Sequence, residues 1–454
     1  MKVLKFGGTS VGSVKSLANV KKIIEAIPGK AIIVVSALGG LTDKLISTAK
    51  LAFQGDNQWK TEMDSIRTRH FDIINEIIEP RFRENLIEIV KDLLNGLEEN
   101  YKEVFISGEL SEKKLDEIVS FGERISSHIV AALIRNGKRY DSLDFMSTEK
   151  WYGKNIIKRD LTDKKIKDTF KHLEEEEKAI VPGFISRDCN TGEITNLGRG
   201  GSDFSGALIA AALGAEVLEI WTDVDGFMTA DPRIVKDAIV IDHLTFTESM
   251  ELCTFGAKVI YPPTIFPVFH NNIPIKILNT FNPEAPGTLI TDHAKPEDLE
   301  IKGVTSLKDV SLITLDIKGK IESKNIIKRV LNLLSDKVVK IIPVNNPEPD
   351  QTLKFALVAS DYQDSLNEIT HELANEISSG EITKPIIENN LTALAIVGRN
   401  MKSKNRLAAR IGHSLVRNGI NIKAYAVNSN TTLIYIIKQE ECTKALPLIH
   451  SLLF

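Results

Sequence analysis

The sequence predicts an α/β fold, a mainly parallel sheet sandwiched by helices, followed by two α+β modules. Up to about residue 290, short apolar runs such as residues 3–6, 30–37 and 216–222 alternate with stretches of helical periodicity. This alternation is typical of a parallel sheet that is covered on both faces. Over residues 283–300 the composition changes to prolines among charged residues, which predicts a linker.

Beyond the linker, the chain contains a weak internal repeat. Residues 337–359 and the segment from Gly419 onward both run strand, turn, strand, with Val344-Asn345 and Val427-Asn428 at corresponding turns. Each copy follows an amphipathic helix, so two copies of one module are expected. The predicted domains are a first domain over 1–290, a linker over 291–300, and modules over 301–385 and 386–454.

Three further elements are predicted inside the first domain. A long helix is expected over residues 114–136, ending before Gly137, and one strand over residues 179–186. The acidic run at residues 174–177 is interpreted as the solvated face of a helix. In a parallel sheet, ligands bind beyond the carboxyl ends of the strands, where the glycine-rich segments of this sequence fall.

Composition limits the classes of partner. The 57 basic and 61 acidic residues give a net charge of -4, which argues against binding nucleic acid through bulk charge. Three widely spaced cysteines and no histidine cluster predict a reduced compartment and no structural zinc site. The amino-terminal segment is not expected to be a signal peptide, and no apolar run reaches membrane-spanning length. A soluble, cytoplasmic protein without nucleic-acid or membrane partners is therefore expected.

The segment KFGGTSVGS resembles a P-loop but does not match the P-loop pattern. Gly7 and Gly12 have the required separation, but Ser13 stands where the P-loop lysine should be. What remains is a strand carrying Lys5, then paired glycines and hydroxyl side chains at the mouth of a helix. Backbone N–H groups at a helix start attract phosphate. An ordinary turn between a strand and a helix explains these residues equally well.

The segment NLGRGGSD, residues 196–203, precedes an apolar helix and offers a second anion site. Its glycines permit close approach of the backbone, and the helix start supplies a partial positive charge. Arg199 provides a planar guanidinium that suits a carboxylate or a phosphate. Asp203 would repel an anion, so it is expected to orient a cation or the loop amides. A plain turn remains the alternative.

Three weaker motifs complete the set. In SFGER, Gly122 costs about 1 kcal/mol relative to alanine inside a helix, which suggests close packing, and Glu123 could hold an ammonium group. A helix contact with an exposed glutamate is the alternative. WTDVDGFMTADPR is partly similar to a calcium loop but lacks the rest of that pattern, so a nucleotide-contact loop fits better. TFGAKVIYP is another glycine-bearing segment, and it contributes Lys258 to the candidate residues.

In this order, KFGGTS, VVSALGGLTD, FGER, GRGGSD, WTDVDG with DPR, and FGAKVIYP resemble the motifs of aspartokinases, over essentially the whole chain. SALGGLTDKLI and the closing HSLLF are more similar to the kinase half of bifunctional aspartokinase–homoserine dehydrogenases. A dehydrogenase follows in those proteins, so this chain could be a truncated piece. The family commonly has Pro where Asp225 stands and Tyr where Met228 stands, which leaves the adenine and ribose contacts open.

The resemblance implies transfer of a phosphoryl group from MgATP to the side-chain carboxylate of L-aspartate, giving 4-phospho-L-aspartate. ATP and Mg²⁺ are the implied cofactors, with the metal held largely by phosphate oxygens and water. By similarity, Lys5 contacts the transferring phosphoryl group with the amides of Gly7 and Gly8 nearby, and Asp203 orients Lys5. An aspartate carboxylate is ionised at neutral pH, so the reaction needs no general base.

The resemblance also assigns the substrate contacts. Arg199 would grip a substrate carboxylate, and Glu123 would pair with the substrate ammonium group. Hydroxyl contacts to aspartate are assigned to Ser36, Thr42 and Ser202, and the nucleotide side to Thr222, Asp223, Arg233 and Lys258.

Two other functions stay open. Acetylglutamate and glutamate 5-kinases share the fold and the glycine loops, although FGER and the paired modules count against them. A non-enzymatic amino-acid sensor is the second alternative. The C-terminal modules resemble paired ACT modules and predict an amino-acid effector, threonine slightly ahead of lysine, at residues 396–401 and 419–425. Threonine-responsive relatives can carry glutamine at the positions of Val344 and Val427, so loss of the response is also open. A homo-oligomer, dimer or higher, is expected.

Overall fold

The computed structural model describes residues 1–318, 323–335, 341–344, 352–358, 362–427 and 429–454. By its internal contacts the chain divides into two compact units. Unit 1 contains Met1–Phe227 and Val259–Ala294, and unit 2 contains Met228–Lys258 and Lys295–Phe454. None of the helices in the described ranges is long and apolar enough to cross a membrane.

This division differs from the predicted boundaries, because residues 228–258 belong to unit 2. Ala230 and Val235 are buried in one apolar core with Ile449 of the C-terminal helix. The hydroxyl of Thr229 lies 2.9 Å from the imidazole Nε2 of His450 in the same core. No change in composition marks this segment, so the sequence alone placed it in the first domain.

The main sheet of unit 1 is almost entirely parallel, as predicted. Its strands run in the order β12-β11-β9-β1-β2-β6-β3, and the only antiparallel pairing among these is β11 with β12. The central strands β1 and β2 are apolar runs that are buried on both faces. The strands are β1 Lys2–Phe6, β2 Ala31–Val35, β3 Gly137–Arg139, β6 Lys178–Pro182, β9 Leu218–Thr222, β11 Ile275–Asn279 and β12 Thr288–Thr291.

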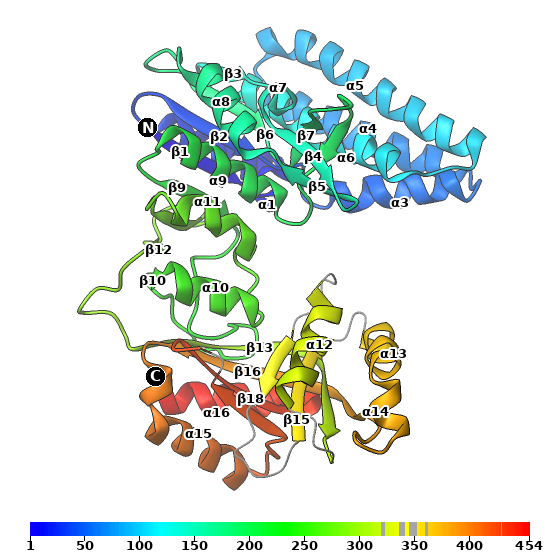
Figure 1. Ribbon diagram of the computed structural model, residues 1–454. Coiled ribbons are helices and arrows are strands. Elements are labelled where there is room, and N and C mark those ends of the chain that lie inside the picture. Colours follow the sequence, from blue (N-terminus) through cyan, green and yellow to red (C-terminus); the bar gives the residue numbers. More distant parts are fainter. Residues whose placement is uncertain (319–322, 336–340, 345–351, 359–361, 428) are drawn as a thin grey trace. The chain divides into compact units, whose positions relative to one another are not determined.

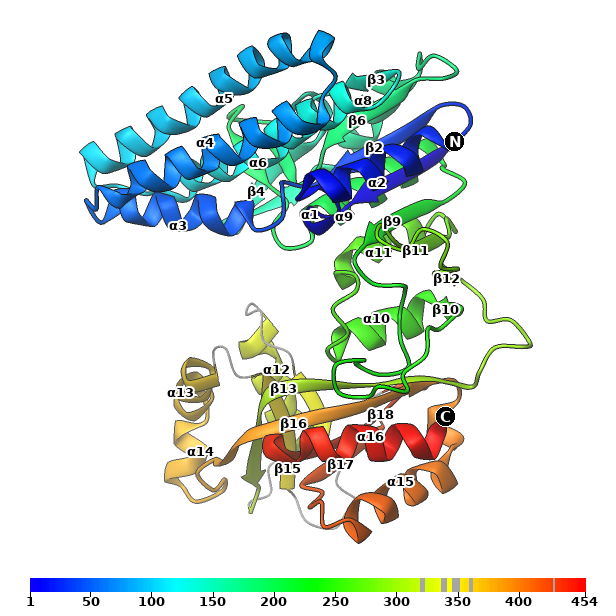
Figure 2. The ribbon, with the colours of Figure 1, turned by 180° about the vertical axis from the view of Figure 1, so that it is seen from behind.

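Helices cover both faces of this sheet (Figures 1 and 2). Leu4 and Phe6 of β1 point into the core formed with α2 and α6, so Lys5, between them, points to the opposite face, against α9. Helices α3, α4 and α5 pack together beside α6. The helices of unit 1 are α1 Gly8–Val11, α2 Val14–Glu25, α3 Leu41–Phe53, α4 Gln58–Ile77, α5 Pro80–Ser107, α6 Glu112–Leu133, α7 Ser142–Phe145, α8 Arg159–Phe170, α9 Gly201–Leu213 and α11 Ile265–Phe269, with a 3₁₀ turn at Pro262–Thr264.

A second, smaller sheet in unit 1 corrects the prediction of one strand over 179–186. The chain forms two strands there, β6 in the main sheet and β7 in a sheet with the order β5-β4-β7-β8. The break falls at Gly183 and Phe184, and Phe184 has a φ of 67°. A Cβ at Gly183 would lie 2.7 Å from the Cβ of Ser202, so the break admits the start of α9. The strands are β4 Ser147–Trp151, β5 Lys154–Ile157, β7 Ile185–Asp188 and β8 Ile194–Asn196.

The acidic run at residues 174–177 is also not on a helix. It lies in the turn between α8 and β6. Glu177 is buried there and accepts a hydrogen bond of 2.5 Å from the hydroxyl of Tyr140. The prediction failed because a run of like charges does not show which members turn inward.

Unit 2 is built on one six-stranded sheet with the order β14-β15-β13-β16-β18-β17. Each predicted module supplies three strands, and the long strands β13 and β16 pair antiparallel in the middle. The predicted repeat is therefore present as structure, although Asn345 and Asn428 of its turns lie outside the described residues. The strands are β13 Ile301–Asp316, β14 Ile341–Val344, β15 Thr352–Val358, β16 Ile386–Gly398, β17 Ala424–Val427 and β18 Thr432–Lys438, with β10 His243–Thr245 in the inserted segment.

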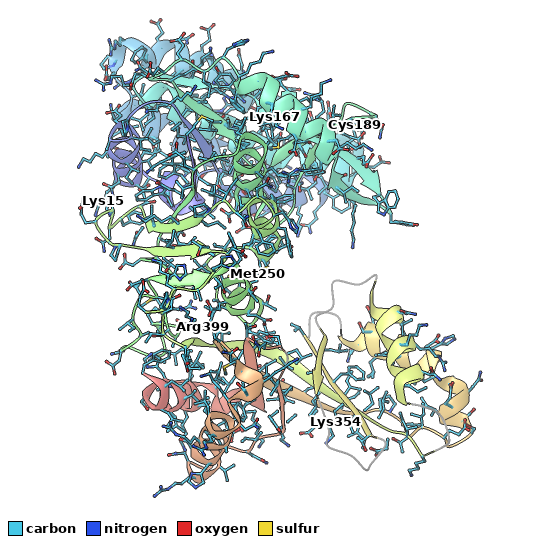
Figure 3. All side chains as sticks on the ribbon, turned by 60° about the vertical axis from the view of Figure 1, so that its left-hand side comes forward. Lys15, Lys167, Cys189, Met250, Lys354 and Arg399 are labelled. Carbon is cyan, nitrogen blue, oxygen red and sulfur yellow. The ribbon has the colours of Figure 1, made fainter. Side chains whose placement is uncertain are left out.

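The predicted linker is held against the end of β16. In Figure 3, Arg399 lies just beyond that strand, and its Nη2 donates to the carbonyl oxygen of Asp298 at 2.6 Å. Asp298 also pairs with His243 at 2.7 Å inside unit 2. The helices of unit 2 are α10 Phe246–Thr254, α12 Ser323–Ser335, α13 Tyr362–Glu372, α14 Ala374–Ser378, α15 Asn405–Arg417 and α16 Cys442–Leu453, with 3₁₀ turns at Met401–Ser403 and Gln439–Glu441.

The close packing suggested by Gly122 is present and yields a prediction. A Cβ at Gly122 would lie 2.7 Å from the Cβ of Ala37, whereas a Cβ at Gly96 in α5 would meet only the ring of Phe121 at 3.5 Å. Alanine favours a helix by about 1 kcal/mol over glycine, but overpacking costs about 1–3 kcal/mol. We expect Gly96→Ala to raise the free energy of unfolding and Gly122→Ala to lower it, as measured by urea denaturation. A stabilised Gly122→Ala protein would contradict the close contact.

Candidate active site

Unit 1 contains a cavity of about 630 Å³ at the carboxyl ends of β1 and β2. Its walls are the loops that follow these strands, one face of α6, and the glycine loop that leads into α9. The lining residues are Lys5, Gly8, Ser36, Ala37, Leu38, Gly39, Gly40, Thr42, Asp43, Ile46, Leu115, Asp116, Val119, Glu123, Phe184, Asn196, Gly198, Arg199, Gly200, Gly201, Ser202 and Asp203.

Lys5 supplies a nearly buried positive charge in this cavity. Its side chain leaves β1 toward α9 and is only 9% exposed. The Nζ atom lies 2.5 Å from Oδ1 of Asp203, in the first turn of α9. The contact expected between these residues is therefore present, and it holds the ammonium group at the end of β1.

The loop after β1 packs directly on the loop after β2 through glycine backbone. A Cβ at Gly12 would lie 2.9 Å from the carbonyl oxygen of Gly8 and 3.1 Å from the nitrogen of Gly39. Side chains at these positions would separate the loops. Arg69 of α4 joins the two loops, because its Nη2 donates to the carbonyl oxygens of Gly12 at 3.0 Å and Gly39 at 2.9 Å.

Gly7 differs from its expected role. Its N–H donates to the carbonyl oxygen of Trp221 at 3.1 Å, and the residue does not line the cavity. The amide is thus used to join the end of β1 to the end of β9. Gly8 does line the cavity, so only one member of the predicted pair faces it.

Glu123 is a buried carboxyl group on α6 that faces the cavity. Its side chain is 3% exposed, and burial raises its pKa to about 8, more than the backbone hydrogen bonds and the charge of Lys5 lower it. Its Oε2 atom has no hydrogen-bond partner among the described residues. Burying such an atom without a partner costs free energy, so the position is suited to a hydrogen-bond donor on a ligand.

The glycine loop before α9 is shaped by close contacts. Gly200 has a φ of 69° and caps the helix, and a Cβ there would lie 2.4 Å from the Cβ of Tyr261. The exposed Arg199 and the buried Ser202 both line the cavity from this loop. Ser36, which follows β2, and Thr42 of α3 line it as well, so all the residues predicted to contact the substrate line one cavity.

The residues predicted for the nucleotide side do not line this cavity. Thr222 ends β9 in unit 1, and its hydroxyl donates to the neighbouring Asp223 at 3.2 Å. Arg233 and Lys258 belong to unit 2, where both are exposed and Arg233 pairs with Asp231 at 2.7 Å. Their role stays a prediction.

Asp225 has a structural task of its own. Its Oδ1 accepts hydrogen bonds from the side-chain amides of Asn279 at 2.8 Å and Asn282 at 3.1 Å, which fixes the turn after β11. Met228 is the first residue of the segment that packs with unit 2. These contacts account for Asp225 without a ligand.

Several residues that line the cavity were not predicted as site residues from the sequence, notably Asp116 and Phe184, and Asn196 was noted only as the first residue of the glycine loop. Asp116 lies seven residues before Glu123 on α6, so helical spacing could have placed both on one face. Arg69 had no comparable signal, because it lies in an amphipathic helix far from any motif.

Comparison with known proteins now gives the family. The model of the amino acid kinase family matches residues 1–279, which is more than half of the chain. The chain belongs to the amino acid kinase family. An ACT domain model matches residues 394–453, within the second C-terminal module. Both matches confirm the predicted fold class.

Curated relatives match this member of the family over its whole length. A bifunctional aspartokinase/homoserine dehydrogenase of Haemophilus influenzae is 30% identical over 100% of the chain and 56% of its own length. Aspartokinase 1, chloroplastic, of Arabidopsis thaliana is 28% identical over 100% of the chain and 80% of its own length. The chain thus spans about half the length of the bifunctional relatives it matches. These names confirm the predicted resemblance to aspartokinases.

A solved structure shares the fold of the whole chain. The structure of E. coli aspartokinase III in complex with aspartate and ADP has a TM-score of 0.82 and 24% identity, covering 99% of both chains.

The bridge made by Arg69 generates a prediction for this family member. Loss of a hydrogen bond from a charged group costs about 1.5–3 kcal/mol. We expect Arg69→Ala to speed amide hydrogen exchange in residues 36–41 while the exchange of β9 stays unchanged. Arg69→Lys, which keeps the charge but loses the planar group of donors, should give an intermediate rate. Exchange that is the same in all three proteins would show that Arg69 does not hold the loops.

Proposed function

We propose that this chain is an aspartate kinase, which transfers the γ-phosphoryl group of MgATP to the side-chain carboxylate of L-aspartate. One observation carries the proposal. A single cavity is lined by Arg199, a cation that suits a carboxylate, and by the buried carboxyl group of Glu123, one oxygen of which has no partner among the residues described. The same cavity holds Lys5, fixed by Asp203. These groups complement a small amino acid that has a second carboxylate.

The chemistry needs few protein groups. A carboxylate oxygen of aspartate forms a bond to the γ-phosphorus, while the bond between that phosphorus and the oxygen bridging to the β-phosphate breaks. The electron pair leaves on ADP, and no proton moves because the carboxylate is already ionised. The obstacle is repulsion between two anions, so positioning and fixed positive charge should supply most of the rate. Lys5 and Arg199 are the cations that line the cavity.

The proposed cofactors are ATP and Mg²⁺. Mg²⁺ usually keeps several waters and binds phosphate oxygens with only one or two carboxylates. Among the residues that the structure describes, no group of three acidic, histidine or cysteine side chains converges as a metal site. A magnesium ion that arrives with the nucleotide fits this arrangement.

An assay of ADP release separates this proposal from its two alternatives. Aspartate, glutamate and N-acetylglutamate would each be offered with MgATP, and we expect release with aspartate alone. Lys5→Ala serves as the control for a contaminating kinase, because losing one preorganised charged group should lower kcat about 10²–10³-fold. Release with another acceptor would favour that kinase, and no release would favour a non-enzymatic sensor.

Arg199 provides a test of the substrate site. If its guanidinium makes a paired contact with a carboxylate of aspartate, Arg199→Lys should weaken kcat/KM for aspartate by about 1.5–3 kcal/mol. The KM for ATP should stay nearly level. A variant that loses ATP affinity and keeps aspartate affinity would instead make this segment a phosphate loop.

The raised pKa of Glu123 predicts coupling between binding and protons. Below about pH 8 the carboxyl group is protonated, so pairing with the aspartate ammonium group must release a proton. Affinity for aspartate should then rise about tenfold per pH unit up to pH 8. Calorimetry in buffers of different ionisation enthalpy should show about one proton released at pH 7. Glu123→Gln should abolish the release, and Glu117→Gln on the same helix should keep it. Equal heats in all buffers would remove Glu123 from the ammonium site.

We also propose that unit 2 is regulatory and binds an amino acid, threonine or lysine, and that the chain acts as a homo-oligomer. The ACT match and the two similar modules support this proposal. The candidate segments are residues 396–401 and 419–425, which are described in the structure. Calorimetry on the full chain should show binding of one of these amino acids together with inhibition of ADP release. If neither binds at millimolar concentration, unit 2 has a structural or dimerising role.

A further inference from the structure

Asp116 is a cavity residue to which the proposed mechanism gives no task. It lies on α6, two turns before Glu123, and both side chains line the same cavity. The two carboxyl groups differ in their partners. Within the part of the chain that the structure describes, Glu123 has an oxygen without a partner, whereas both oxygens of Asp116 accept hydrogen bonds from side-chain amides.

These amides come from two different strands of the smaller sheet. The Nδ2 of Asn196, the last residue of β8, donates to Oδ1 of Asp116. The Nδ2 of Asn155, on β5, donates to Oδ2 of Asp116 at 3.3 Å. One carboxylate therefore joins α6 to the end of β8 and to the β4–β5 hairpin.

The contact with Asn196 continues into the glycine loop. The side-chain oxygen of Asn196 accepts a hydrogen bond from the N–H of Gly198 at 2.9 Å, which closes a turn immediately before Arg199. Gly198 has a φ of 71°, so the turn needs a backbone conformation that side chains rarely adopt. Because the amide of Asn196 is held by Asp116, its oxygen is aimed at Gly198. The chain of contacts runs from α6 to the residue that precedes Arg199.

We propose that Asp116 is a positioning residue that holds the turn at Asn196–Gly198 and thereby sets the place of Arg199 in the cavity. The part that concerns the substrate rests on the proposed function, since it takes Arg199 as the residue that grips aspartate. Asp116 itself does not touch the reacting atoms. Its effect passes through Asn196 and the backbone of the loop.

The charge of Asp116 gives this contact a pH dependence. Burial, and next the nearby charge of Glu112, raise the pKa of Asp116 to about 6, while the Asn155 amide, Lys150 on β4 and Asn196 oppose the rise. Above this pH the ionised carboxylate accepts from both amides. Below it one oxygen carries a proton and can no longer accept in the same way, so the turn should loosen. Replacing Glu112 by glutamine removes a like charge, which should lower the pKa of Asp116. The turn should then loosen only at a lower pH.

The test uses the full chain with Asp116→Ala, Asp116→Asn, Glu112→Gln and the control Glu117→Gln. Glu117 neighbours Asp116 on α6 but does not line the cavity. For each protein, amide exchange of residues 196–201 is measured by mass spectrometry, and KM for aspartate, KM for ATP and kcat are measured between pH 5 and pH 8.

We expect Asp116→Ala to speed exchange at residues 196–201 and to raise the KM for aspartate about tenfold, as for the loss of one hydrogen bond to a charged group. The KM for ATP should change little. Asparagine keeps one acceptor oxygen, so Asp116→Asn should restore most of the protection at residues 196–201 and remove the change in that protection near pH 6. The separate dependence of the KM for aspartate on Glu123 should remain. Glu117→Gln should match the unmodified protein. Glu112→Gln should move the change in protection at residues 196–201 to lower pH.

Unchanged exchange at residues 196–201 in Asp116→Ala would overturn the proposal, whatever the kinetics. Faster exchange with an unaltered KM for aspartate would overturn the link between Asp116 and substrate binding. The role of Arg199 is decided separately by Arg199→Lys. If the unmodified chain released no ADP with aspartate, the proposed function would fail, and the exchange measurement would still decide the contact made by Asp116.

Discussion

Lys5 occupies a cavity whose lining contains four carboxyl groups, those of Asp43, Asp116, Glu123 and Asp203, and two cations. An ammonium group that is 9% exposed needs a partner, since moving a charge out of water is costly. Asp203 provides the partner at 2.5 Å because α9 begins beside the end of β1. Such buried pairs add little net stability to a fold. The consequence that matters here is a fixed position for the charge, which a flexible lysine lacks on its own.

The rest of the site is formed by backbone segments that approach one another closely. The loops after β1 and β2 meet through Gly8, Gly12 and Gly39, and α6 reaches the second loop at Gly122. Arg69 then joins the two loops by donating to a carbonyl oxygen of each. A Cβ at any of these glycines would push the neighbouring segment away. The shape of the cavity wall therefore depends on residues that have no side chain. Of the polar residues that line it, Lys5 is held by Asp203 and Asn196 is held by Asp116.

The division of the chain into units changes the interpretation of the nucleotide residues. Arg233 and Lys258 come from the middle of the sequence, yet they belong to the compact unit that also carries the ACT match. Thr222 and Asp223 belong to the other unit. The residues predicted to contact aspartate, by contrast, all line one cavity of unit 1.

The sequence by itself predicted a mainly parallel sheet and the repeat in the C-terminal part. It also pointed to one site that contains Lys5, Glu123, Arg199, Ser202 and Asp203. Periodicity predicts the sheet and the repeat because it reflects local backbone geometry. The membership of the five residues in one site was implied by the resemblance to aspartokinases. Only the tertiary structure decided that Gly7 uses its amide on Trp221, that Gly183 breaks a strand in two, and that Asp116 holds Asn196. It also decided that residues 228–258 pack with unit 2. These features depend on contacts between segments far apart in the chain, and such contacts leave no periodic pattern in the sequence.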